Sequence, residues 1–197
     1  MEKRLVSPKA FRIIKPEIRV LGVDDGKFIP HTKGTVIVVG VVFRGGYSID
    51  GVIHTKVAID GLDATEQLVS MINASPHRRQ LRLIMLNGIT FAGFNLVDIK
   101  KLNEATNLPV LALTHEKPDL EKIRKALRNL PDFEERWRII LAAGEIHEVK
   151  NKATKIYLEL AGITLSDAQK IIKLTSTRSC LPEPLRVAHM VASGITS

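Results

Sequence analysis

The chain has 197 residues, of which 45% are hydrophobic and 25% charged, as in an ordinary soluble globular protein. Its formal net charge of +8 suits a phosphate-rich partner, and no apolar run approaches the roughly 20 residues of a membrane span. A single cysteine, Cys180, excludes an internal disulfide framework and favours a reducing cytoplasm. We expect one domain over residues 1–197, with a basic amino-terminal segment at 1–17.

Three strands are expected in the first third of the chain. Residues 18–26 form an apolar run that ends in two aspartates and a glycine, and residues 35–43 and 47–59 are also rich in β-branched side chains. Two glycines at 45–46 supply the positive φ angles that a hairpin turn requires. The loops between these runs are too short for a crossover helix, so we expect an antiparallel meander.

From residue 60 onwards, helical and strand patterns alternate. Asp63 and Glu66 have the spacing of a capping box, which indicates a helix start. A fourth strand at 81–86 ends at Asn87 and Gly88. The remaining expected elements are a helix at 95–106, a strand at 108–113, helices at 120–130 and 133–141, strands at 145–149 and 155–160, and helices at 166–174 and 184–195.

This order of elements predicts an α/β fold. A β-meander that continues as right-handed βα units gives a mixed β-sheet with helices on both faces, which is the layout of ribonuclease H-like domains. In such a sheet the first and fourth strands are neighbours. We therefore expect Asp24 and Asn87 to project from adjacent strand ends.

Asp24 and Asp25 stand where a buried strand stops, and two interpretations of them are open. Adjacent ionised carboxylates repel each other, and a divalent cation relieves that repulsion. Alternatively, the Asp-Asp-Gly sequence simply begins a turn. Because side chains alternate along a strand, we expect Asp25 to point to the opposite face from Asp24 unless the strand breaks at once.

Three stretches resemble endonuclease V, a magnesium-dependent enzyme with a ribonuclease H-like fold that cleaves nucleic acid near deaminated adenine. GVD at 22–24 is similar to its first-strand motif, whose aspartate binds metal, and LIMLNG at 83–88 is similar to its fourth-strand motif. ITLSDA at 163–168 and LPEPLRVA at 181–188 resemble its final two helices and the link between them. The resemblance covers residues 18–194 and implies an endonuclease V-like fold.

The sequence is closer still to an uncharacterised, largely archaeal protein family that is related to endonuclease V. FRGGY at 43–47, SPHRRQ at 75–80 and RSCLPEP at 178–184 are similar to motifs of that family. This second resemblance brings no established activity with it.

The chain departs from endonuclease V at several functional positions. Asn87 stands where the fourth-strand motif has a second metal-binding aspartate, and a neutral amide binds two cations less well than a carboxylate does. The nearest matches to the family's helix-capping glutamate are Asp63 and Asp60. Its late histidine falls at 161–162, where this chain has alanine and glycine. Together these departures indicate a change of substrate or of chemistry.

The resemblance implies a site for Mg²⁺ or Mn²⁺. Its candidate metal ligands are Asp24, Asp25, Asp63 and Asn87, and its candidate catalytic residues are Asp24, Asp63 and Asn87. The sequence offers simpler explanations for two of them, because Asp63 suits a helix cap and Asn87 suits a turn with Gly88.

DNA or RNA is the expected partner. Arg78 and Arg79 are candidate phosphate contacts, and Gly88 and Phe91 lie in a loop that could admit a base. Alternatively, the arginines belong to a solvated face and Phe91 is a packing residue.

We expect a metal-dependent endonuclease or a catalytically altered descendant of one. The main alternative is a non-catalytic nucleic-acid-binding protein with the same fold, and a third is a nucleotide or small-ligand binder that uses the same cleft. Glu183 and Arg186, on either side of Pro184, are expected to lock the last helix in place.

Overall fold

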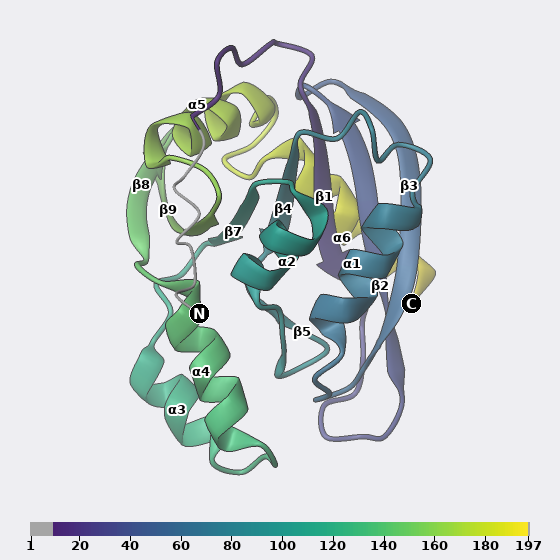
Figure 1. Ribbon diagram of the computed structural model, residues 1–197, viewed down its shortest axis with the longest axis vertical. Coiled ribbons are helices and arrows are strands. Elements are labelled where there is room, and N and C mark those ends of the chain that lie inside the picture. The colour runs from purple at the N-terminus through teal and green to yellow at the C-terminus, as the bar shows by residue number, and fades with distance from the viewer. Residues whose placement is uncertain (1–9, 197) are drawn as a thin grey trace, which may run out of the picture.

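A seven-stranded sheet separates two layers of helices in the computed structural model, which describes residues 10–196 (Figure 1). Residues 1–9 of the basic segment expected at 1–17 therefore lie outside the described residues. No helix within 10–196 is both long enough and apolar enough to cross a membrane.

The strands and helices follow one another much as the sequence predicts. The strands are β1 (Arg19–Asp25), β2 (Thr35–Arg44), β3 (Ser48–Ala58), β4 (Leu83–Asn87), β5 (Thr90–Phe91), β6 (Asn95–Leu96), β7 (Val110–Thr114), β8 (His147–Asn151) and β9 (Thr154–Ala161). The helices are α1 (Ala64–Ala74), α2 (Ile99–Thr106), α3 (Leu120–Leu127), α4 (Phe133–Ala143), α5 (Leu165–Thr175) and α6 (Glu183–Ile195).

The strand order in the sheet is β3-β2-β1-β4-β7-β9-β8. The first three strands pair antiparallel, β4 pairs parallel with both β1 and β7, and β9 and β8 are antiparallel again. The predicted meander and the predicted neighbourhood of the first and fourth strands are both confirmed. The carboxyl ends of β1 and β4 consequently lie side by side.

Alternate residues of the central strands pack into different helix layers. Leu21 and Val23 belong to the core that α1 and α2 cover, whereas Val20 packs in the core that α5 and the start of α6 cover. Figure 1 shows α1 and α2 in front of the sheet and α6 behind it. This alternation places the side chain of Asp24 on the α6 side and that of Asp25 on the α1 side.

One predicted boundary is wrong. The helix expected at 95–106 begins only at Ile99, because residues 90–96 form the hairpin of β5 and β6. Asp98 is the true cap of α2, and its Oδ1 accepts hydrogen bonds from the backbone N–H groups of Lys100 and Lys101. Pairing with a neighbouring strand thus overrides the helical pattern of the first four residues.

Helix α6 lies directly against the backbone of β1. A Cβ atom added to Gly22 would come within 2.2 Å of the carbonyl carbon and oxygen of Pro184, so only glycine permits this approach. Farther along, the Thr196 hydroxyl accepts a hydrogen bond from the Lys27 backbone N–H at 2.8 Å. The helix is therefore held along β1 at both of its ends.

Candidate functional site

Asp24 is a buried carboxylate at the carboxyl end of β1, with 3% of its surface exposed. Its Oδ1 accepts a hydrogen bond from the Asp25 backbone N–H at 3.0 Å. Its Oδ2 faces two other side chains, one from β4 and one from α6. The surrounding polar groups compensate for the burial of a charged group at this strand end.

The first partner of Asp24 is Asn87, the last residue of β4. The Asn87 Nδ2 donates a hydrogen bond to Asp24 Oδ2 over 3.1 Å. The expected meeting of these two side chains at adjacent strand ends is confirmed. It follows from the parallel pairing of β1 and β4, which aligns their carboxyl ends.

The second partner, His189 on α6, was not predicted from the sequence. Its Nδ1 lies 2.8 Å from Asp24 Oδ2, and 62% of its side chain is exposed. The available signal was its position one residue after Ala188, beside the buried stripe of Leu185, Ala188 and Ala192. That stripe faces the sheet, so a histidine at its border lies near a strand end.

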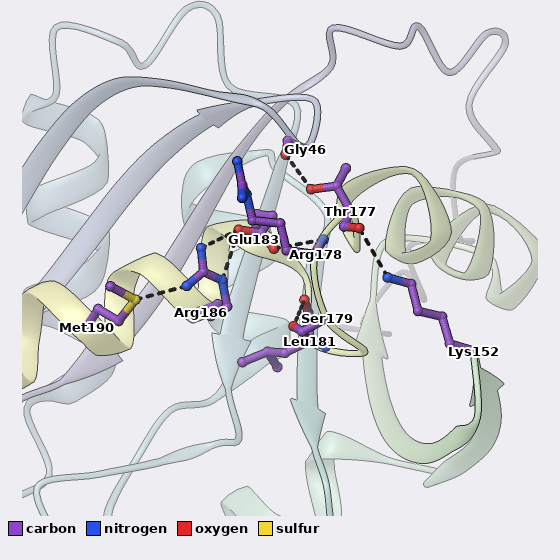
Figure 2. A network of polar contacts seen from close by, with 9 residues as sticks. All are labelled: Gly46, Lys152, Thr177, Arg178, Ser179, Leu181, Glu183, Arg186 and Met190. Carbon is purple, nitrogen blue, oxygen red and sulfur yellow. Dashed lines mark hydrogen bonds and ion pairs between the residues drawn. The ribbon is translucent and has the colours of Figure 1, made fainter.

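An ion pair between a buried carboxylate and a partly exposed arginine fixes the start of α6 (Figure 2). Glu183, only 2% exposed, accepts hydrogen bonds from the Arg186 guanidinium at 2.7 and 2.9 Å and from the Arg178 backbone N–H at 3.2 Å. The expected locking role of Glu183 and Arg186 is confirmed. The pair joins the link before α6 to its first turn, which sets where His189 lies along β1.

Asp25 points away from Asp24, as strand alternation predicts. Its Oδ2 accepts a hydrogen bond from the Ala92 backbone N–H at 2.6 Å, on the α1 side of the sheet. Burial, with a smaller contribution from the charge of Asp24, raises the pKa of Asp25 to about 6. The Asp25 carboxylate is therefore held by the β5–β6 hairpin while it stays close to that of Asp24.

Asp63 is also directed away from Asp24. Its Oδ1 accepts hydrogen bonds from the Ala58 backbone N–H at 3.1 Å and from Asn95 Nδ2 at 2.6 Å. Asp63 occupies the cap position of α1 without a capping hydrogen bond, because Asn95 Oδ1 accepts from the Ala64 N–H instead. Asp63 is therefore the N-cap residue, as predicted, but the expected hydrogen bond from its side chain is absent.

Asp60, the other match to the helix-capping glutamate, shapes the loop after β3. It has a positive φ of 50°, and its Oδ1 accepts a hydrogen bond from the Phe94 backbone N–H at 2.9 Å. Its Oδ2 lies 3.6 Å from Nδ1 of His31. These contacts tie the loop to the β5–β6 hairpin rather than to Asp24.

Arg136 on α4 binds these same loops, and this role was not predicted from the sequence. It is 1% exposed, and its guanidinium donates to the carbonyl oxygens of Asp60, Gly61, Phe94 and Pro131 at 2.6 to 3.0 Å. Its charge is thus solvated by backbone carbonyl groups instead of water. The loops that carry Asp60 and Phe94 are fixed to α4 in this way.

The expected nucleic-acid contacts are dispersed over the molecule. Arg78 donates to the Thr106 carbonyl and to Asn73 Oδ1, and so joins α1 to the end of α2. Phe91 is 1% exposed in the core beneath α1, which corrects its expected role as a stacking residue. Gly88 directly follows Asn87 and has a positive φ of 77°. Arg79 is exposed near the start of β4, whereas Asp24 lies where β1 ends.

Of the four expected metal ligands, the structure brings together Asp24 and Asn87. Within residues 10–196 there is no group of three or more His, Cys, Asp or Glu side chains that could hold a metal ion. The site at the carboxyl ends of β1 and β4 therefore consists of Asp24, Asn87 and His189.

Comparison with known proteins places the chain among archaeal relatives. A family model described as "Endonuclease dU" matches residues 16–196. A UPF0215 protein of Methanothermobacter thermautotrophicus is 50% identical over 187 residues, which cover 94% of this chain and 91% of the relative. The resemblance to an archaeal family related to endonuclease V is confirmed.

Solved structures with the same fold include a protein of unknown function from Archaeoglobus fulgidus. It has a TM-score of 0.82 and 44% identity, and the match covers 90% of this chain and 97% of that one. Endonuclease V of Bacillus subtilis matches with a TM-score of 0.61 at 12% identity, over 96% of this chain and 84% of that one. The predicted endonuclease V-like, ribonuclease H-like fold is therefore confirmed.

Proposed function

The chain belongs to the endonuclease dU family, and from this premise we propose that it is an endonuclease that hydrolyses a phosphodiester bond of DNA at a deaminated base. The observation that carries the proposal is the convergence of Asp24, Asn87 and His189 where β1 and β4 end. The family name makes deoxyuridine the first base to test. Inosine is the second, because a structural neighbour, endonuclease V of Ciona intestinalis, is in complex with DNA that contains inosine.

His189 is the general base in this proposal. A carboxylate only accepts hydrogen bonds, so Nδ1 of His189 carries the proton in its 2.8 Å contact with Asp24. In the neutral ring, Nε2 is then left to accept a proton from an attacking water molecule. The same carboxylate–imidazole pairing orients the base of many hydrolases. The exposure of the ring suits an encounter with a bound phosphate.

Asp24 and Asn87 orient this base. Asp24 holds the imidazole ring by one nitrogen, and Asn87 donates to the same carboxylate oxygen, which fixes the rotamer of Asp24. The buried position of Asp24 strengthens both contacts, because water competes weakly there.

The donor set fits one divalent cation better than two. Asp24 and Asn87 offer the oxygen atoms that Mg²⁺ prefers, and Mg²⁺ commonly takes one or two carboxylates and completes its shell with water and phosphate oxygens. Asp24 and Asn87 are thus the residues that would hold Mg²⁺ or Mn²⁺. Such an ion would stabilise the charge that develops on the phosphate and acidify a bound water.

The test is cleavage of end-labelled DNA oligonucleotides that carry one deoxyuridine, one inosine or neither, each single- and double-stranded, with Mg²⁺, Mn²⁺ or a chelator. We expect cleavage of a deaminated substrate that depends on the cation. Asp24→Asn and His189→Ala should each lower the rate by about 10²-fold or more, the range for loss of a positioned acid–base group. Asp132→Asn is a matched control, because Asp132 is exposed, makes no capping bond and has a positive φ that asparagine tolerates.

Two results would contradict the proposal. Wild-type rates in Asp24→Asn or His189→Ala would remove those side chains from the reaction. Tight binding of the oligonucleotides by the wild-type protein, without cleavage under either cation, would instead favour a non-catalytic nucleic-acid-binding protein.

A further inference from the structure

The edge of the sheet where β1 and β4 begin lies opposite the edge that carries Asp24. Arg19 and Asp24 are five positions apart on β1, which corresponds to roughly 16 Å at about 3.3 Å per residue. Two hollows open at this edge. Their exposed cationic and aromatic residues, which we call the basic edge, are Lys15, Tyr47, Arg79, Arg82 and Arg178.

The first hollow has a volume of about 360 Å³. Lys15, Arg19, Arg79 and Arg82 line it, together with one acidic residue, Glu17. These residues come from two segments, one that leads into the start of β1 and one that leads into β4. The two segments are joined by a hydrogen bond of 2.9 Å that the Arg82 N–H donates to the Arg19 carbonyl. The hollow thus has a rigid floor and an excess of positive charge.

The second hollow, of about 400 Å³, lies between the β2–β3 turn and the start of α6. Tyr47 and Arg178 line it, and the side chain of Tyr47 is 82% exposed although it is large and aromatic. The turn touches both hollows. Gly45 donates to the carbonyl of Ile18, which lines the first, and Gly46 lines the second.

The cations of the basic edge differ from their neighbours in pairing. Arg19 and Arg44 form ion pairs with Asp50. In contrast, Lys15, Arg79, Arg82 and Arg178 form no ion pair with any residue in the part of the chain that the structure describes, 10–196. Unpaired cations gathered at one place favour an anionic partner.

The backbone around Arg178 is fixed before any partner arrives (Figure 2). Buried Glu183 holds the Arg178 N–H, and the Thr177 hydroxyl donates to the Gly46 carbonyl at 2.8 Å. The link before α6 and the β2–β3 turn are thereby joined, and they present Arg178 and Tyr47 from one rigid unit. Such preorganisation lowers the entropic cost of binding.

Three sequence stretches that supply none of Asp24, Asn87 and His189 meet here. FRGGY at 43–47 supplies Tyr47, SPHRRQ at 75–80 supplies Arg79, and RSCLPEP at 178–184 supplies Arg178. Proteins commonly bind single-stranded nucleic acid with cationic side chains, which contact phosphates, and with exposed aromatic rings, on which bases stack. Stacking on a base would cover the exposed ring of Tyr47 beside the phosphates that the cations contact.

We propose that the basic edge is a second binding site, for single-stranded nucleic acid, in which Tyr47 stacks on a base while Lys15, Arg79, Arg82 and Arg178 contact phosphates. The choice of nucleic acid as partner rests on the proposed function. The site itself is separate from Asp24, so it holds a segment of the strand away from the bond that is cleaved.

The test is fluorescence anisotropy with an unmodified 20-nucleotide DNA strand in a chelator, repeated over a series of salt concentrations. We expect Arg79→Ala/Arg178→Ala to weaken binding about 10-fold. It should also reduce the slope of log K against log salt by about 1.4, because each lost phosphate contact on a single strand accounts for about 0.7. Tyr47→Ala should weaken binding about 5-fold or more without changing the slope.

A charge-matched control separates this site from the rest of the basic surface. Lys100→Ala/Lys125→Ala removes two exposed cations from α2 and α3 and should leave the affinity within about 2-fold. Equal losses in the charge-matched control, or wild-type binding by Arg79→Ala/Arg178→Ala, would overturn the proposal. So would binding to phosphatidylserine vesicles in preference to the strand. Since no cleavage is measured, a failure of the proposed endonuclease activity would leave this result unaffected.

Discussion

Replacing Gly22 by alanine is expected to separate α6 from β1 and to open the site. The new Cβ would lie 2.2 Å from the backbone of Pro184, whereas ordinary contact begins near 3.4 Å, so the start of α6 must retreat by about 1.2 Å. A rigid shift of that size is enough to break the 2.8 Å contact between His189 and Asp24. Overpacking of this kind costs about 1–3 kcal/mol of stability.

Two measurements check this expectation. Denaturant unfolding should show Gly22→Ala to be less stable by that amount, and cleavage of the deaminated substrate should fall by about 10²-fold, the usual effect of a 1 Å misplacement. Gly194→Ala is the matched control on the same helix, because its Cβ would meet nothing within 4 Å. It should stabilise the helix by about 0.5–1 kcal/mol and leave cleavage unchanged.

The reasoning would be refuted if Gly22→Ala were as stable as the wild type and cleaved at the same rate. Loss of stability with full activity would be equally informative. It would show that α6 is displaced without affecting the reaction, and His189 would lose its role.

Three further predictions concern buried polar groups. Burial raises the pKa of Glu159 to about 7, so the folded state keeps its proton over a pH range in which the unfolded state releases it, and the free energy of unfolding falls as pH rises from about 4.5 to 7. Thermal melts should show Glu159→Gln to be more stable than the wild type by roughly 3 kcal/mol at pH 8 and nearly equal to it at pH 4. Equal stability of the two proteins at pH 8 would contradict this prediction. Arg136→Met leaves buried carbonyl groups without a hydrogen-bond donor and should lower the free energy of unfolding by about 3 kcal/mol or more, measured from denaturant unfolding. A loss below about 1 kcal/mol would mean that water replaces the guanidinium. Asn87→Asp places a second carboxylate beside Asp24 and should strengthen Mg²⁺ binding in calorimetry by about 10-fold, and no gain would remove residue 87 from a metal site.

The fold was predictable because most of its elements have a strong local pattern. Apolar runs defined the strands, and the shortness of the first loops required a meander. The neighbourhood of Asp24 and Asn87 then followed from strand order alone. The β5–β6 hairpin was missed because its two-residue strands are shorter than any periodic pattern can reveal.

The site was less predictable because it depends on contacts between distant segments. His189 meets Asp24 only because Gly22 lets α6 lie against β1, and no local pattern reports that approach. Asp63 fits the capping rules, yet Asn95 from a distant hairpin supplies the cap instead. Arg136 lies in a run of charged residues typical of a solvated helix face, and only the packing of α4 against the loops buries it.

The distance along the chain between Asp24 and His189 has a consequence for biosynthesis. The two residues are 165 positions apart, and a polypeptide leaves the ribosome amino terminus first. Strand β1 can therefore pair with β2 and β3 well before α6 has been translated. A nascent or prematurely terminated chain would have the sheet and its carboxylate but no imidazole beside it. The proposed hydrolytic activity would thus arise only after α6 has been translated and has packed against β1.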